Sequence, residues 1–221
     1  YFGLDIADDL KKEYEINTTM IGAPLFDLGE DIGLLIFHKF KKEFSSQIIK
    51  EDKLKKYNHL SSYCNCKNCL FISLGESEEN KANNNIHLNS ENFINNFCEI
   101  DLFSPTSIND LMPLSIPRAW HSMVFIPKKY IFIIGGNTNK VEIYDTEKTT
   151  VQVDSEMKET RNECSLFCMN NSVLYAFGGS KDEGIYLKTI EKCNLRTNER
   201  KWEMVNFKAS GNIALQDCFY V

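Results

Sequence analysis

Three cysteines close together are the residues whose types and spacing most resemble a metal site. Cys64, Cys66 and Cys69 lie within six residues of one another, and His59 is the nearest candidate for a fourth ligand. A structural zinc ion needs four such ligands in a tetrahedron. The repeat described below places Cys64 in a strand and Cys66 near the following turn, where successive side chains point to opposite faces. We therefore predict ordinary strand thiols, with zinc as the alternative, and assign no metal ligands.

The other chemically active side chains do not form a catalytic set. A hydroxyl nucleophile needs a base and an orienting acid, and no Ser, His and Asp positions suggest that arrangement. His121 stands where a second copy of the repeat has Cys164, and the other histidines, His38, His59 and His87, are scattered. We predict a protein that is not an enzyme and that uses no cofactor.

Charge and composition exclude several kinds of partner. The chain has 31 acidic and 25 basic residues, a net charge of −6, which disfavours binding to phosphate backbones and anionic lipid. No apolar run approaches the ~18 residues of a membrane helix. The eight cysteines show no compact secreted framework. We therefore expect no nucleic acid, no membrane and a reducing, cytoplasmic location, with these five thiols buried in strands: Cys98, Cys164, Cys168, Cys193 and Cys218.

Two stretches of the chain match each other without a gap. Residues 118–136 align on residues 161–179, an offset of 43 positions. An arginine, a serine, a polar turn, an apolar strand and a glycine pair coincide: Arg118 with Arg161, Ser122 with Ser165, Tyr130–Ile134 with Val173–Phe177, and Gly135-Gly136 with Gly178-Gly179. A weaker copy lies 60 positions upstream of the first, where Gly75 falls on Gly135 and Glu76 replaces the second glycine.

Each copy continues with a second half that ends in aspartate or asparagine. Val141–Asp145, which contains Tyr144, matches Ile190–Asn194 and Phe97–Asp101. Trp202 follows eight residues after Asn194. Each repeat is therefore interpreted as four short strands.

A four-stranded antiparallel sheet cannot bury both of its faces alone, but sheets stacked radially bury their faces against each other. This physical argument predicts a β-propeller. Tyr130–Ile134 and Val173–Phe177 lack polar alternation, as expected for strands covered on both faces. The glycines that follow permit positive φ and close backbone approach, and Trp202 is expected to pack as an apolar plate between blades.

The order of Arg, His-Ser, apolar strand, Gly-Gly, Val-Glu-x-Tyr-Asp and Trp resembles the kelch repeat. The resemblance covers about residues 57–221, with repeats at 57–112, 113–156 and 157–205 and the start of another at 206–221. It implies an all-β kelch β-propeller of about three blades plus the start of another, in a partner-binding protein. Six or seven blades of ~45 residues need more than this chain provides, so we expect a fragment of a longer protein.

Two segments depart from the repeat. Residues 1–56 do not align with it, and the apolar spacing over Asp31–Leu54 slightly favours a helix. The alternative makes Leu34–Phe37 a strand of a degenerate blade. Residues 76–96 are polar and rich in asparagine, which predicts a loop insertion.

Strands of a blade alternate in direction, so the loop before the first strand and the loop after the second lie on one face. We predict that this face binds a protein partner. The candidate contacts are Arg118, Arg161, Lys181, Asp182 and Glu183, and the alternative role of the two arginines is to tie blades together through backbone carbonyls. The leading function is an interaction scaffold. The alternatives are a substrate-recognition subunit of a ubiquitin ligase and, less favoured, a kelch-like enzyme; the resemblance also makes a cytoskeletal partner conceivable.

Overall fold

The structure, a computed structural model, describes residues 20–28, 31–49, 62–73, 75, 93–105, 108–126, 129–182 and 185–206. It divides into two compact units, Tyr1–Ala119 (unit 1) and Trp120–Val221 (unit 2), and each is described by itself. The described residues form strands and turns and no helix, so the all-β prediction is confirmed. Accordingly, within these ranges no helix has the length and apolarity needed to cross a membrane.

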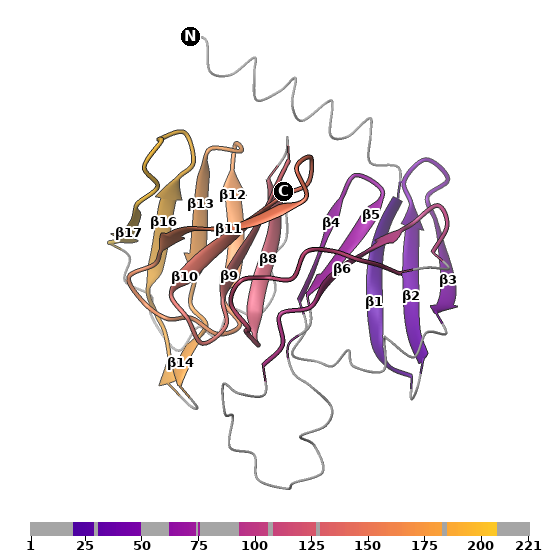
Figure 1. Ribbon diagram of the computed structural model, residues 1–221, viewed down its shortest axis with the longest axis horizontal. Coiled ribbons are helices and arrows are strands. Elements are labelled where there is room, and N and C mark those ends of the chain that lie inside the picture. The colour runs from indigo at the N-terminus through magenta and orange to yellow at the C-terminus, as the bar shows by residue number, and fades with distance from the viewer. Residues whose placement is uncertain are drawn as a thin grey trace, which may run out of the picture. The chain divides into compact units, whose positions relative to one another are not determined.

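Unit 1 contains two antiparallel sheets (Figure 1). The first has three strands in the order β1-β2-β3, and the second has four in the order β4-β5-β6-β7. Their bounds are β1 (Met20–Leu28), β2 (Asp31–His38), β3 (Glu43–Ile49), β4 (Ser62–Cys66), β5 (Cys69–Ser73), β6 (Phe97–Asp101) and β7 (Ile108–Asp110).

Unit 2 contains two four-stranded antiparallel sheets, β8-β9-β10-β11 and β12-β13-β16-β17, and a small ribbon, β14-β15, inserted between β13 and β16. The bounds are β8 (His121–Ile126), β9 (Tyr130–Gly135), β10 (Lys140–Asp145), β11 (Thr150–Glu156), β12 (Ser165–Met169), β13 (Val173–Phe177), β14 (Ser180–Asp182), β15 (Ile185–Tyr186), β16 (Ile190–Asn194) and β17 (Trp202–Val205). Each aligned copy of the sequence repeat thus contains one four-stranded meander.

The helix expected within Asp31–Leu54 is wrong over its described part, which forms β2 and β3. The alternative, a strand at Leu34–Phe37, is correct. The apolar spacing fitted both a helix and a strand. Lys42 has a φ of 55°, which ends any helix. Its N–H donates to the carbonyl of His38 at 2.8 Å and closes a turn.

Within segment 1–56, residues 20–28 form β1, and residues 1–19, 29–30 and 50–56 lie outside the described residues. Most of the loop at 76–96 also lies outside them, as does the predicted start of a repeat at 206–221, apart from Asn206.

The aspartate or asparagine at the end of each repeat's third strand makes the turn that follows. Oδ1 of Asp145 accepts the backbone N–H groups of Glu147 and Lys148 at 3.0 and 3.1 Å. Oδ1 of Asn194 and of Asp101 each accept the N–H two residues further on, at 3.0 and 2.9 Å. These side chains replace a backbone acceptor at the tight turn, which explains why only these two residue types occur there.

Glycine is required where the backbones of unit 2 come closest. Gly135 has a φ of 78°, and a Cβ there would lie 2.2 Å from the carbonyl oxygen of Arg161. Gly179 has a φ of 82°, and its Cβ would lie 2.4 Å from the carbonyl oxygen of Asn162. Both the conformation and the space exclude a side chain.

The core of unit 2 lies between its two large sheets. It contains side chains of both, including Phe132 and Ile134 of β9 and Leu174 of β13. Trp202 is buried in this core, and its Nε1–H donates to Ser155 Oγ at 3.1 Å, so β17 of one sheet is joined to β11 of the other. Trp202 is therefore a core residue, and its one polar atom has a hydrogen-bond partner.

The other face of β13 is not fully covered. Val173, Tyr175 and Phe177 are half-buried, in alternation with buried Leu174 and Ala176. The expectation of a strand covered on both faces therefore holds for β9 and not for β13.

Unit 1 has its own core, with Leu34 and Ile36 of β2 packed in one cluster with Leu70 of β5. Two hydrogen bonds also fix β1 to β4. The Gly22 N–H donates to Asn65 Oδ1 at 2.8 Å, and Asn65 Nδ2 donates to the Gly22 carbonyl at 2.9 Å. The Asn65 amide therefore satisfies the outward backbone groups of an edge strand.

Candidate functional site

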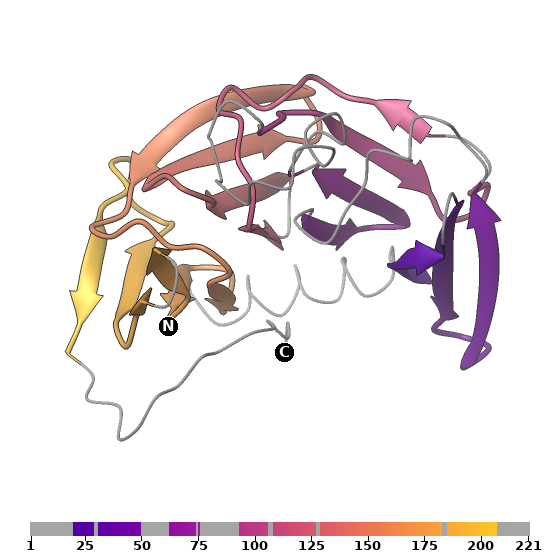
Figure 2. The same ribbon diagram turned by 90° about the horizontal axis from the view of Figure 1, so that it is seen from below.

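The loops of unit 2 converge at one end of its sheets. The segment after β9 meets the segment before β12, because the Gly136 N–H donates to the Arg161 carbonyl at 2.9 Å and the Asn137 N–H to Asn162 Oδ1 at 2.7 Å. Asn162 and Ser180 then exchange two backbone hydrogen bonds, at 2.7 and 2.8 Å. Figure 2 turns this end of unit 2 toward the viewer. We call the loops 136–140, 157–163 and 178–189 the loop face; it is the arrangement that strand alternation predicted within this unit.

An asparagine clamp occurs in two meanders, one in each unit, and holds the segment after the fourth strand to the residue just before the third. Asn139 Nδ2 donates to the Met157 carbonyl at 3.0 Å, while the Met157 N–H donates to the Asn139 carbonyl at 2.8 Å. In unit 1, Asn95 and Leu114 make the same pair of bonds, both at 2.8 Å. The sequence analysis missed this clamp, although Asn95 and Asn139 occupy corresponding positions just before β6 and β10.

Arg161 lies beneath the loop face, fully buried, with a complete set of partners. Its NH1 donates to the carbonyls of Gly178 and Thr189 at 2.8 and 3.0 Å. Its Nε donates to Glu191 Oε1 at 3.2 Å, and its NH2 donates to Glu159 Oε2 at 3.0 Å and to Thr189 Oγ1 at 2.8 Å. The guanidinium therefore joins the two loops that flank it.

Glu191 is the buried counterion of this network, with no exposed surface. Besides Arg161, it accepts the backbone N–H groups of Lys158 and Glu159 at 2.6 and 3.1 Å. A carboxylate is tolerated in such a place only when it is paired and hydrogen-bonded. The sequence contained a sign of this buried carboxylate, because two matched strands carry a glutamate at the same position, Glu142 and Glu191, and both are fully buried.

Of the two roles considered for the arginines, the structure shows the carbonyl-binding one for Arg161. The carbonyls belong to one sheet and its loops, rather than to two blades. Arg118 is also fully buried. Neither guanidinium is at the surface, so a direct contact of either with a partner does not fit this structure.

The β14-β15 ribbon is an exposed part of the loop face, and Figure 1 shows it at the lower end of its blade. Lys181 is exposed in β14, and Asp182 ends that strand; the side chain of Asp182 and the whole of Glu183 lie outside the described residues. The sequence analysis missed Ile185 and Tyr186, whose side chains are 54% and 60% exposed. Two large apolar side chains on a short ribbon are the kind of anchor that protein interfaces use.

The three clustered thiols of unit 1 lie on β4 and at the start of β5. Cys64 and Cys66 point to the same, buried side of β4, and Cys66 is the cross-strand neighbour of Cys69. Burial raises the pKa of Cys64 well above its usual value, of Cys66 to about 12 and of Cys69 to about 11. Among the described residues, no three His, Cys, Asp or Glu side chains are placed to hold an ion. His59 lies outside those residues.

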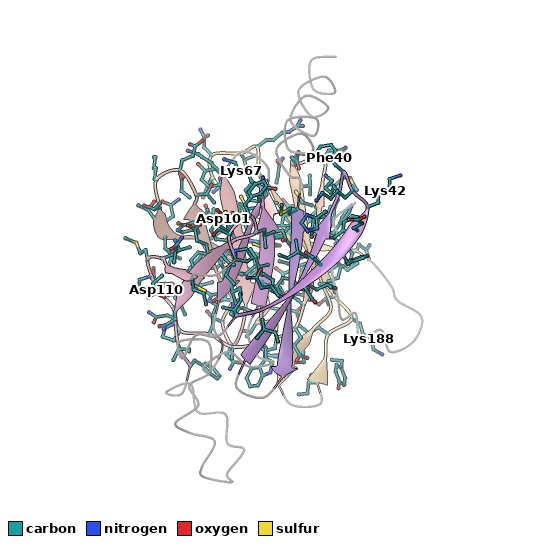
Figure 3. The ribbon with its side chains drawn as sticks, turned by 90° about the vertical axis from the view of Figure 1, so that its right-hand side faces the viewer. Phe40, Lys42, Lys67, Asp101, Asp110 and Lys188 are labelled. Atoms are coloured by element: carbon teal, nitrogen blue, oxygen red, sulfur yellow. The ribbon has the colours of Figure 1, made fainter. Side chains whose placement is uncertain are left out.

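Unit 1 carries a second exposed apolar group on and beside β3. Phe40, Phe44 and Ile48 are 77%, 67% and 56% exposed, and the rings of Phe37 and Phe44 lie 4.9 Å apart. Figure 3 labels Phe40 and Lys42 in the β2–β3 turn. An apolar blade face is the ordinary packing surface of a propeller blade, so it does not by itself indicate a ligand.

Comparison with known proteins gives curated sequence matches and solved structures of similar fold. Kelch-like protein 23 is 33% identical over 92 residues in Homo sapiens and 32% identical over 90 residues in Mus musculus, which is 41% and 40% of this chain. The match spans only 16% of either relative's length. The solved structure of YjhT aligns with a TM-score of 0.59 at 10% identity, over 86% of this chain and 66% of that one. No protein-family model matches the chain.

Proposed function

We propose that this chain, which is a kelch-repeat protein with a kelch propeller fold, binds other proteins through the loop face and carries out no chemistry of its own. The observation that supports the proposal most directly is the β14-β15 ribbon, which presents Ile185 and Tyr186 to solvent above a rigid, hydrogen-bonded base. The names of the relatives are consistent with an interaction scaffold. They say nothing about which partner this chain binds.

The base of the ribbon is fixed before any partner arrives. Leu187, next to Tyr186, is buried and donates its N–H to the Gly179 carbonyl at 2.8 Å. Arg161 binds Thr189 two residues further on. Because this base does not have to be ordered on binding, less conformational entropy is lost when a partner contacts the residues that it holds.

Site-specific photocrosslinking tests the proposal. A photoreactive phenylalanine analogue would replace Tyr186 on the loop face and, as the matched control, Met169. Met169 is 44% exposed and is the last residue of β12, at the opposite end of the strands. We expect defined crosslinked proteins from the Tyr186 position and not from the Met169 position. Equal crosslinking from both sites, or none from either, would contradict a binding role for the loop face.

Once a partner is identified, replacing Ile185 and Tyr186 with serine measures how much these two side chains contribute to the affinity. Central apolar anchors typically contribute ~2 kcal/mol or more, so the affinity should fall by about 30-fold. Lys148→Ser, at an exposed residue in the β10–β11 turn at the opposite end of the strands, is a control expected to change affinity by less than about threefold. A double serine variant that binds like the parent would remove the ribbon from the interface.

The narrower candidate, a substrate-recognition subunit of a ubiquitin ligase, requires an adaptor-binding region in addition to the repeats. It stays a prediction, because the curated match covers a small part of the relatives. Co-purification of the full-length protein with a ligase adaptor would support it, and its absence from a complex that still contains the loop-face partner would count against it.

We also propose a cytoplasmic location. The seven cysteines among the described residues are all free thiols, six of them buried, as is usual in a reducing compartment. Imaging of the full-length protein with a fluorescent tag checks this, and a secreted or lumenal signal would contradict it.

A further inference from the structure

The ribbon on the loop face is the outer part of a small three-row ladder. Asn162 forms one row and exchanges two backbone hydrogen bonds with Ser180 in the middle row, β14. Ser180 is in turn the cross-strand neighbour of Tyr186 in β15. Tyr186 and the residues that follow it are therefore the outermost row.

The hydrogen bonds determine which way the outer backbone groups point. Since both polar groups of Ser180 face Asn162, Ser180 and Tyr186 form a non-hydrogen-bonded pair, and the flanking bond is the one from the Leu187 N–H to the Gly179 carbonyl. The N–H and carbonyl of Tyr186 then point away from β14. No hydrogen bond from another described residue reaches them.

The same alternation applies one step further along. Leu187 bonds inward to Gly179, and the Thr189 carbonyl bonds inward to the Gly178 N–H at 3.0 Å. Lys188 lies between them, so its backbone groups face outward like those of Tyr186. The outer row thus has two outward-facing residues, Tyr186 and Lys188, separated by one inward-facing residue, as along the edge of a strand.

This edge is held rigidly, which a binding edge needs. Leu187 is buried, and Thr189 is bonded through its carbonyl to Arg161 and through its hydroxyl to Arg161 and Glu159. The outer residues therefore sit on a fixed base while their side chains remain in solvent. Tyr186 is 60% exposed, and Lys188 projects from the ribbon in Figure 3.

We propose that the outer edge at Tyr186 and Lys188 binds an extended segment of a protein partner by adding it as an antiparallel strand. This rests on the proposed function and names how the loop face engages its partner. In such pairing the backbone supplies affinity and alternate side chains supply specificity. An apolar residue of the partner lies opposite Tyr186, and an acidic residue two positions earlier lies opposite Lys188. A lysine on the edge disfavours pairing with a second copy of this chain.

The probe is a short fluorescent peptide with alternating valine and threonine, a central phenylalanine and a glutamate two residues before it. Its matched control has the same side chains, with methyl groups on the two backbone nitrogens that pair with the edge. Fluorescence anisotropy with the 221-residue chain should show at least about tenfold weaker binding of the methylated peptide, because backbone hydrogen bonds are lost. Amide exchange at Tyr186 and Lys188 should slow only with the unmethylated peptide.

Equal binding of the two peptides, binding of neither, or protection of amides elsewhere would overturn the proposal. A Tyr186→Pro variant removes one outward N–H directly, and the methylated peptide keeps the test valid if that variant does not fold. Equal binding of both peptides together with crosslinking at Tyr186 would mean that the loop face binds partners in another way. Strand addition without crosslinking at Tyr186 would instead contradict the proposed function.

Discussion

Removing the buried arginine is the most informative perturbation of unit 2. In Arg161→Met the five hydrogen bonds of the guanidinium are lost and Glu191 keeps a buried charge without its counterion. Breaking a buried ion pair in this way typically costs about 3–5 kcal/mol. We expect the free energy of unfolding of unit 2 to fall by that amount, because methionine fills the space but cannot pair with the carboxylate.

Urea unfolding followed by tryptophan fluorescence measures this loss. The chain has two tryptophans, Trp120 and Trp202, and both lie in unit 2, so the signal reports on that unit. Lys181→Met is the matched control, since the same substitution at an exposed lysine should change stability by less than about 0.5 kcal/mol.

A double-mutant cycle separates the ion pair from simple packing. Arg161→Met combined with Glu191→Met should be less destabilising than the sum of the two single changes by about 1–3 kcal/mol, because neither charge is then left alone. Strict additivity would refute the reasoning. So would an Arg161→Met protein within about 0.5 kcal/mol of the parent.

Three further predictions concern the backbone and the thiols. Gly179→Ala should lower the stability of unit 2 by more than ~1 kcal/mol, since its φ is 82° and a Cβ would lie 2.4 Å from the Asn162 carbonyl; an unchanged thermal midpoint would contradict this. Asn65→Ala should cost about 1–3 kcal/mol and speed amide exchange at Gly22, because both outward backbone groups lose their partner; parent-like exchange would count against the Asn65–Gly22 link. Burial raises the pKa of Cys164 to about 11 from 9.0, so at pH 8 its thiolate is roughly a hundredfold scarcer than in the unfolded chain; disulfide-reagent kinetics with and without urea check this, and equal rates would refute it.

Much of the fold could be predicted from local pattern. The copies at 118–136 and 161–179 identified strands, turns and glycines that the structure contains, because those features depend on a residue and its immediate neighbours. Asp145 and Asn194 illustrate this, since each makes its turn with its own backbone two residues on. Because the same strands, turns and glycines occur in each copy, comparison of the copies revealed them.

The candidate site was less predictable, because it depends on which surfaces are left uncovered. The loops of the face could be named from strand direction, yet Ile185 and Tyr186 were missed, since a short apolar pair in a polar loop resembles ordinary core. For Arg161, the sequence left two roles equally open: contact with a partner at the surface and binding of backbone carbonyls inside. Only its burial and its five hydrogen bonds decide between the two roles.

By itself, the sequence determined the repeat, the four-strand unit, the positions where only glycine fits and the residue types that close the turns, because each is an effect of short range along the chain. Tertiary structure decided that residues 31–49 are strands, that Arg161 pairs with Glu191 inside, that Asn65 protects the edge of β1 and that Tyr186 and Lys188 present their backbone outward. Each of these depends on groups tens of residues apart, or on the register of a strand pair. Hydrogen bonds between groups so far apart in the sequence, and the burial of their side chains, are determined only when the chain has folded.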